Sequence, residues 1–175
     1  MASSHDEVAR AFVAAARHRL AEATAKIKHC LNQLSDEQLW WRPREPLNSV
    51  ANLVLHLCGN VRQWVVCGIT GEPDTRDRPQ EFAERGPLPR AELARRLEEV
   101  VGQADAAMGT LDAARLLEPR RIQGFDTTVL GALLDSLPHF SGHTQEIVFL
   151  TRLQLGDTYR MKWAPATPEQ GAPSA

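Results

Sequence analysis

Residues 5–34 read HDEVARAFVAAARHRLAEATAKIKHCLNQL, and they carry two interleaved seven-residue repeats. One repeat consists of small residues and the other of larger apolar ones, namely Ala9, Ala16, Ala23 and Cys30, then Val13, Leu20, Ile27 and Leu34. Apolar residues spaced alternately by three and four positions lie on one face of an α-helix. The small row lets a neighbouring helix approach closely, and the large row fills the groove between them. The pattern predicts a long helix that packs against other helices.

Three further stretches show helical spacing of apolar residues. The first is capped by Asn48 or Ser49 and runs to about Gly68, and the second runs from Leu93 to Leu111. The third is capped by Asp126 or Thr127 and ends at Leu155, because Gly156 follows as a stop signal. Residues 70–89 are rich in proline, glycine and charge, and this segment is too long for a simple turn between antiparallel neighbours. We therefore predict an all-α fold, a four-helix bundle with one long crossover connection.

Prolines indicate local structure both between and within the predicted helices. The stretch from Leu39 to Pro46 is expected to be a loop, because two prolines three apart prevent a helix from continuing. Residues 119–125 fit a turn or a small hairpin. Pro138 lies inside the fourth predicted helix and favours a kink there, although it also fits a helix start near that position.

Composition indicates one compact domain without strongly charged partners. The chain has 175 residues, is 43% hydrophobic and carries a net charge of −2, so neither nucleic acid nor an anionic membrane is an expected partner. We expect a single domain over residues 1–163 and a disordered tail over 164–175. Three cysteines without a CxxC pattern, and a start without a secretory signal, predict a cytoplasmic protein.

The fourth predicted helix carries two histidines at a spacing that suits a metal ion. His139 and His143 are four residues apart, so their side chains lie on one face of the helix. Asp135 and Glu146 share that face, which continues into leucines and so indicates a polar patch directed into the bundle. The same spacing also arises by chance on helix surfaces, and each carboxylate fits a surface ion pair, such as Glu146 with Arg152.

The second predicted helix offers a third histidine. His56 lies on a polar edge with Asn52, Asn60 and Gln63. Together with His139 and His143 it would supply three neutral nitrogen donors, which leaves positions open for water or substrate, as in catalytic metal sites. A hydrogen-bonded histidine at the edge of the core, beside a solvated face, is the alternative interpretation of His56.

In order and approximate spacing, three pieces of this sequence resemble the DinB/YfiT-like superfamily of metal-dependent proteins. They are LWWRP at residues 39–43, NSV leading to His56 at residues 48–56, and HFSGHTQEI at residues 139–147. The resemblance covers about residues 5–155 and points to an uncharacterised branch. It implies a four-helix bundle with one crossover, often dimeric. It also implies a divalent metal such as nickel, zinc or iron, held by His56, His139 and His143.

Two functions fit this pattern. The first is a metal-dependent enzyme that activates water or a low-molecular-weight thiol, with S-transferase or hydrolase chemistry on a small-molecule substrate. In it Glu146 would act as a general base or as the partner of a ligand histidine, with Asp135 as a second candidate. The alternative is a non-catalytic homodimeric bundle that binds metal or interacts through the small-residue face of the first helix.

Overall fold

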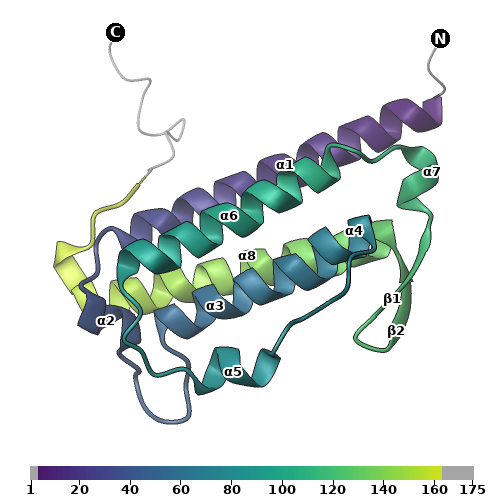
Figure 1. The fold of residues 1–175 in the computed structure, drawn as a ribbon. Helices are drawn as coiled ribbons and strands as arrows, with labels where there is room; N and C mark the ends of the chain where they lie inside the picture. The colour runs from purple at the N-terminus through teal and green to yellow at the C-terminus, as the bar shows by residue number, and fades with distance from the viewer. Residues whose placement is uncertain (1–3, 163–175) are drawn as a thin grey trace, which may run out of the picture.

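The computed structural model describes residues 4–162, and its main feature is four long helices packed side by side (Figure 1). They are α1 (Ser4–Leu31), α3 (Val50–Val61), α6 (Arg90–Met108) and α8 (Val129–Leu155). Helix α1 packs against α6 and α8, and α3 packs against the same two helices. The predicted all-α four-helix bundle is confirmed. No helix within residues 4–162 is both long enough and apolar enough to cross a membrane.

The long connection between α3 and α6 is the predicted crossover. Helix α3 continues as a π-helix, η1 (Arg62–Cys67), and ends in a short turn of helix, α4 (Gly68–Thr70). Because α3 and α6 run in the same direction, the segment between them returns along the length of the bundle (Figure 1). It contains a helix that the sequence did not predict, α5 (Arg78–Ala83), whose first turn is capped by Asp77. The tail predicted over residues 164–175 lies outside the described part of the chain.

The interleaved repeats of the first helix form its contact face, as predicted. All eight repeat residues are buried, and none of them is more than 7% exposed. The helix ends at Leu31, so the last of them, Leu34, lies just beyond α1 and the predicted end was three residues too late. Ile27 and Cys30 are completely buried, at the end of α1 that packs against the C-terminal part of the bundle. The heptad pattern therefore identified the core side of α1 correctly over its whole length.

Side-chain caps define where the two site-bearing helices begin. Ser49 caps α3, since its side chain accepts a hydrogen bond from the backbone N–H of Asn52, and the Asn52 side chain accepts one from Ser49 in return. Thr128 caps α8, so the predicted caps Asp126 and Thr127 are wrong by one or two residues. The reason is that strand pairing keeps the chain extended through Thr128.

Short elements close the ends of the bundle. The predicted turn or hairpin is a hairpin of β1 (Pro119–Ile122) and β2 (Phe125–Thr128). Its two turn residues, Gln123 and Gly124, have φ values of 51° and 85°, which is the left-handed region that tight hairpin turns require. The remaining short elements are α2 (Asp36–Trp40), α7 (Ala113–Leu116) and the 3₁₀ turn η2 (Gly156–Thr158). Helix α2 occupies the start of the loop expected from Leu39, because Ser35 and Gln38 form a capping box there.

Helix α8 runs through Pro138 without ending. The interpretation of Pro138 as a helix start is therefore wrong, while the expected kink stays a prediction. Proline leaves the carbonyl four residues earlier without its usual helix donor. That carbonyl belongs to Leu134, and since Leu134 and Pro138 are both exposed, water can satisfy it. The helix therefore continues and places His139 and His143 on one face, as their spacing predicts.

Candidate metal centre

Three histidines from two helices meet in the bundle. His56 comes from α3, and His139 and His143 come from α8. One ring nitrogen of each lies within 4.8 Å of those of the other two, and Nε2 of His56 lies 2.9 Å from Nε2 of His139. Nitrogen ligands lie about 2.0–2.1 Å from zinc, so two of them on one ion are about 3–3.5 Å apart. One observed separation is 2.9 Å and none exceeds 4.8 Å, so the donor set fits a divalent ion.

The electrostatic surroundings favour the neutral, metal-binding form of His139. Burial is the main cause that lowers its pKa to about 4, and the charges of His143, His56, Arg76 and Arg78 lower it further. A neutral imidazole has a lone pair that can bind a metal, whereas an imidazolium has none. This nitrogen is therefore available as a ligand at neutral pH.

Two of the three histidines are hydrogen-bonded through Nδ1 to a carboxylate. Nδ1 of His56 lies 2.9 Å from Oε2 of Glu81, and Nδ1 of His143 lies 2.7 Å from Oε2 of Glu146. An ionised carboxylate can only accept, so each Nδ1–H is the donor and each Nε2 keeps its lone pair. Carboxylates behind histidine ligands in this way fix the ring orientation in metal sites. The predicted surface pair of Glu146 with Arg152 is absent from residues 4–162.

Glu81 is tied to a buried arginine of the crossover. Nε of Arg76 donates to Oε1 of Glu81 over 2.7 Å, and Nη2 donates to Oε2 over 2.8 Å. The side chains of Arg76 and Glu81 are only 4% and 10% exposed. Burial alone would raise the pKa of the Glu81 carboxyl, but hydrogen bonds and charge from Arg76 and His56 outweigh burial and hold it below its usual value. Glu81 is therefore an anion when it accepts from His56.

Comparison with known proteins identifies the family of this chain. A family model described as "Protein of unknown function (DUF1572)" matches residues 7–166. The chain belongs to the DUF1572 family. Among solved structures it is similar to a conserved protein from Enterococcus faecalis, with a TM-score of 0.67, 15% identity, and coverage of 81% of this chain and 96% of that one. A search of curated proteins found no match.

A second solved structure supports the DinB-like assignment. It is a DinB-like protein from Bacillus cereus ATCC 10987, with a TM-score of 0.60, 18% identity, and coverage of 75% of this chain and 85% of that one. The fold that the DinB/YfiT-like resemblance implies is thereby confirmed, and the matching family is described as one of unknown function. Identities this low establish the shared fold. What the DUF1572 chain does has to be argued from its own residues.

The polar edge predicted around His56 divides into structural and site residues. Asn52 belongs to the cap of α3, and its amide donates to the backbone carbonyls of Glu81 and Glu84 at 2.9 and 3.0 Å. Oδ1 of Asn60 accepts from Ser136 over 2.8 Å and joins α3 to α8. Oε1 of Gln63 accepts from Nη1 of Arg76 over 2.9 Å. Asn52 and Gln63 thus hold the crossover against the helix that carries His56.

Glu81 and Arg76 were not among the predicted site residues, because residues 70–89 were expected to form only a connection. One signal for α5 was present, since Asp77 followed by Pro79 is typical of a helix start. That signal would have placed Glu81 on a helix. It could not have shown that Glu81 faces His56, which is 25 residues earlier in the chain.

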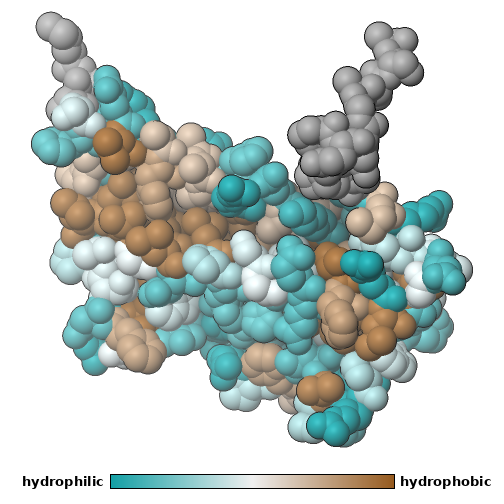
Figure 2. All heavy atoms as spheres, turned by 180° about the vertical axis from the view of Figure 1, so that it is seen from behind, coloured by the Kyte–Doolittle hydropathy of each residue, from teal (hydrophilic) through white to brown (hydrophobic). Residues whose placement is uncertain are grey.

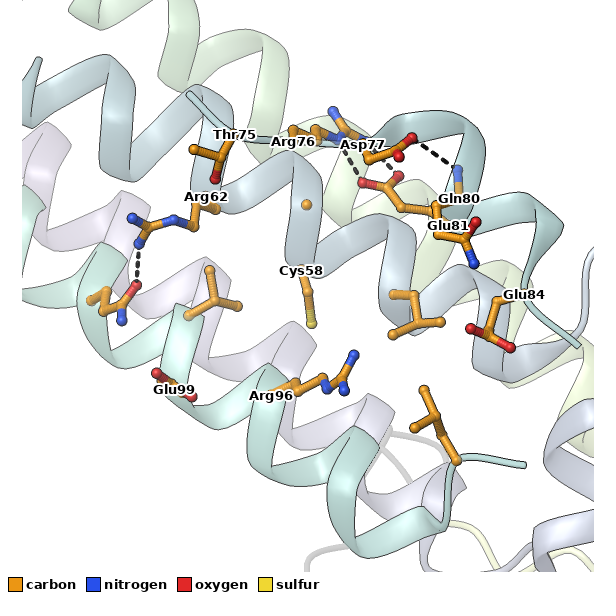
Figure 3. Close-up of a pocket in the computed structure, with 15 residues that line it drawn as sticks. Cys58, Arg62, Thr75, Arg76, Asp77, Gln80, Glu81, Glu84, Arg96 and Glu99 are labelled. Carbon is orange, nitrogen blue, oxygen red and sulfur yellow. Dashed lines mark hydrogen bonds and ion pairs between the residues drawn. The ribbon is translucent and has the colours of Figure 1, made fainter. Parts of the chain in front are cut away.

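Two cavities adjoin the site, and Arg76 lines both of them. The larger, of about 660 Å³, lies between α3, α6 and the crossover, and the thiol of Cys58 points into it (Figure 3). Burial raises the pKa of Cys58 to about 12, so this thiol stays protonated at neutral pH. The smaller, of about 320 Å³, is lined by His56 and His139 together with Asn60, Trp64, Arg76, Arg78, Gln123 and Asp135. The smaller cavity therefore gives access to two of the three histidines, His56 and His139.

Proposed function

We propose that this protein is a divalent-metal-dependent enzyme of the DinB-like type, with His56, His139 and His143 as ligands of nickel, zinc or iron. The observation that carries the proposal is the convergence of three histidine nitrogen donors beside a cavity of about 320 Å³. Three protein ligands leave coordination positions open for another molecule. A divalent ion held there would act as a Lewis acid and lower the pKa of a coordinated water or small thiol.

The chain's own residues would orient the ligands and handle a proton. Glu81 would keep Nε2 of His56 directed at the ion, because it accepts the proton on Nδ1. Glu146 would do the same for His143. Since the Glu146 side chain is 44% exposed, its carboxylate is also open to substrate, and we assign it the role of general base. Thiol transfer or hydrolysis is the reaction class that these groups would serve.

The metal and thiol parts of the proposal are tested by absorption spectroscopy of protein loaded with cobalt(II) as a stand-in for zinc. We expect close to one bound cobalt per chain, and a new sulfur-to-metal absorption band when a thiol such as 2-mercaptoethanol is added. A metal content below about a tenth of an equivalent after loading would contradict the metal site. A loaded site whose spectrum does not respond to thiols would instead leave hydrolysis as the favoured reaction.

The small-residue face of α1 is buried inside the bundle, so the predicted interaction through that face is wrong. We propose instead that two copies associate through the outer face formed by α1 and α8, as the alternative, non-catalytic function. Figure 2 shows a broad apolar area below the start of α1 on this side of the molecule. The large exposed apolar side chains of these two helices are Val8, Leu134, Phe149 and Leu153. Contiguous apolar surface rimmed by polar residues is typical of protein interfaces.

Replacement of Leu134 by glutamate tests this interface. We expect the wild-type protein to sediment as a dimer and Leu134→Glu as a monomer, because a charge buried in an apolar interface is costly. Phe125→Glu is the matched control, since Phe125 is 64% exposed but lies on the hairpin rather than on α1 or α8. A wild-type protein that sediments as a monomer at micromolar concentration would overturn the dimer proposal.

The three cysteines support placing the protein in the cytoplasm. Cys30, Cys58 and Cys67 are all free thiols. Free thiols persist in a reducing compartment, whereas small secreted domains usually pair theirs. Fractionation of the native host is the direct check.

A further inference from the structure

The cavity beside the three histidines contains two charged side chains without an ion-pair partner. Arg78 lies at the start of α5 and Asp135 lies on α8, one turn before His139. Within residues 4–162 neither is paired with an opposite charge, although many other arginines and acids of this chain are. Both are exposed side chains that line the same small cavity, and no ion pair joins them. The cavity therefore offers one free cation and one free anion beside the candidate metal site.

Packing holds Arg78 close to the histidines. Its guanidinium lies over the ring of Phe82, 5.1 Å from the ring centroid. The Phe82 ring packs in turn against His56, with 4.8 Å between centroids. Arg78 is thus positioned through an aromatic ring that itself touches a proposed ligand.

Each of the two unpaired charges in the cavity would be offset by an opposite charge on a bound molecule. The positive charge of Arg76 is neutralised by Glu81, but that of Arg78 is not. A bound divalent ion would add two further positive charges nearby, and like charges at short range repel. A carboxylate on the bound molecule would offset Arg78, and an ammonium group would offset Asp135.

We propose that the small molecule bound at this site is a zwitterion that carries both a carboxylate and an amino group, such as an amino acid or an amino-acid thiol. Its carboxylate pairs with Arg78 and its amino group with Asp135, which leaves its thiol or another donor atom for the ion that the three histidines would hold. The volume of about 320 Å³ suits such a molecule, since it corresponds to roughly ten water molecules. The ring of Trp64 supplies an apolar wall for the carbon atoms between the charged groups. This inference rests on the metal site proposed above.

Titration of cobalt-loaded protein with three thiols tests the two charge contacts separately. L-cysteine has both groups, cysteamine lacks the carboxylate, and 3-mercaptopropionate lacks the amine. We expect L-cysteine to bind about fivefold more tightly than either truncated thiol, since each contact is a charge-assisted pair that is partly open to water. Cobalt content measured after each titration shows whether the thiol has removed the metal.

Variants of Arg78 and Asp135 test whether these two side chains make the proposed contacts with the carboxylate and the amino group. Arg78→Gln should weaken L-cysteine and 3-mercaptopropionate about fivefold and leave cysteamine unchanged, with Arg78→Lys retaining part of the affinity. Asp135→Asn should weaken L-cysteine and cysteamine and leave 3-mercaptopropionate unchanged. Arg121→Gln is the matched control, because Arg121 is exposed and paired with Asp126 outside the cavity.

The outcomes separate this inference from the proposed function. If cobalt binds but all three thiols bind equally, or if Arg78→Gln weakens cysteamine as much as L-cysteine, the zwitterion is wrong and the metal site stands. If no cobalt binds to the wild-type protein, the metal site and the zwitterion are both overturned.

Discussion

Replacement of both His139 and His143 by alanine is expected to abolish metal binding. The double variant keeps only His56, and a single nitrogen cannot hold a divalent ion against water and buffer. Metal content after loading with nickel, zinc or cobalt should fall from about one equivalent to less than about a tenth, as measured by elemental analysis. The gain in thermal stability from added metal should disappear as well, because only binding to the folded state provides it.

The fold is expected to survive this double substitution. Neither His139 nor His143 belongs to the buried apolar core, and both lie inside a helix where alanine is well tolerated. Far-ultraviolet circular dichroism should therefore match that of the wild type. His18→Ala is the matched control, because this histidine is exposed on α1 and pairs with Glu22 far from the site. A double variant that retains full metal content would show that the three histidines are not the ligands.

Removal of the Glu81 carboxylate is expected to have the largest effect on stability. Glu81→Ala would leave Arg76 buried without its anionic partner, which typically costs about 3–5 kcal/mol of the free energy of unfolding. Urea denaturation of metal-free protein measures this loss directly. Glu92→Ala is the control, because Glu92 pairs with Arg95 and Arg96 at the surface, where water replaces the lost contacts and little change is expected. Equal effects of the two variants would contradict the structural role of the buried pair.

A second variant separates stability from the orientation of His56. Replacing the whole pair, by Arg76→Met with Glu81→Leu, removes both charges together and should restore most of the lost stability. It would still leave Nδ1 of His56 without its acceptor. Metal affinity should therefore remain about 10–100-fold weaker than in the wild type. Recovery of metal affinity together with stability would mean that Glu81 has no positioning role.

Gly59 allows an independent test of the same arrangement without removing a charge. A Cβ atom at this position would overlap with Oε1 of Glu81 and lie 2.8 Å from Nε of Arg76. Gly59→Ala should therefore push the carboxylate away from Arg76 and His56 and weaken metal binding. Gly142→Ala is the matched helical control, because a Cβ there meets nothing within 4 Å. It should raise stability by about 0.5–1 kcal/mol and leave metal binding unchanged.

Much of the fold follows from local patterns in the sequence. The two heptad rows of residues 5–34 identified the buried face of α1, since side-chain direction in a helix depends on spacing alone. The same rule placed His139 and His143 on one face of α8. The cap of α3 was also predictable, because Ser49 and Asn52 hydrogen-bond to each other's backbone groups over only three residues.

Features that depend on strand pairing or on short helices were harder to predict. The start of α8 shifted to Thr128 because the hairpin holds the preceding residues extended. Helix α5 was missed because six residues in a polar segment show no hydrophobic repeat. In both cases contacts with other parts of the chain, rather than local preference, set the boundaries.

The sequence by itself determined the helices, the core face of α1 and the pairing of two histidines, because each depends on residues within a few turns of one helix. Only the tertiary structure brought His56 to that pair, placed Glu81 and Arg76 behind it, and formed the cavity with Arg78 and Asp135. The physical reason is that the path of the crossover is set by buried hydrogen bonds between residues far apart in the chain. Such bonds follow no periodic pattern in the sequence, so they could be identified only from the packing of α3, α5 and α8.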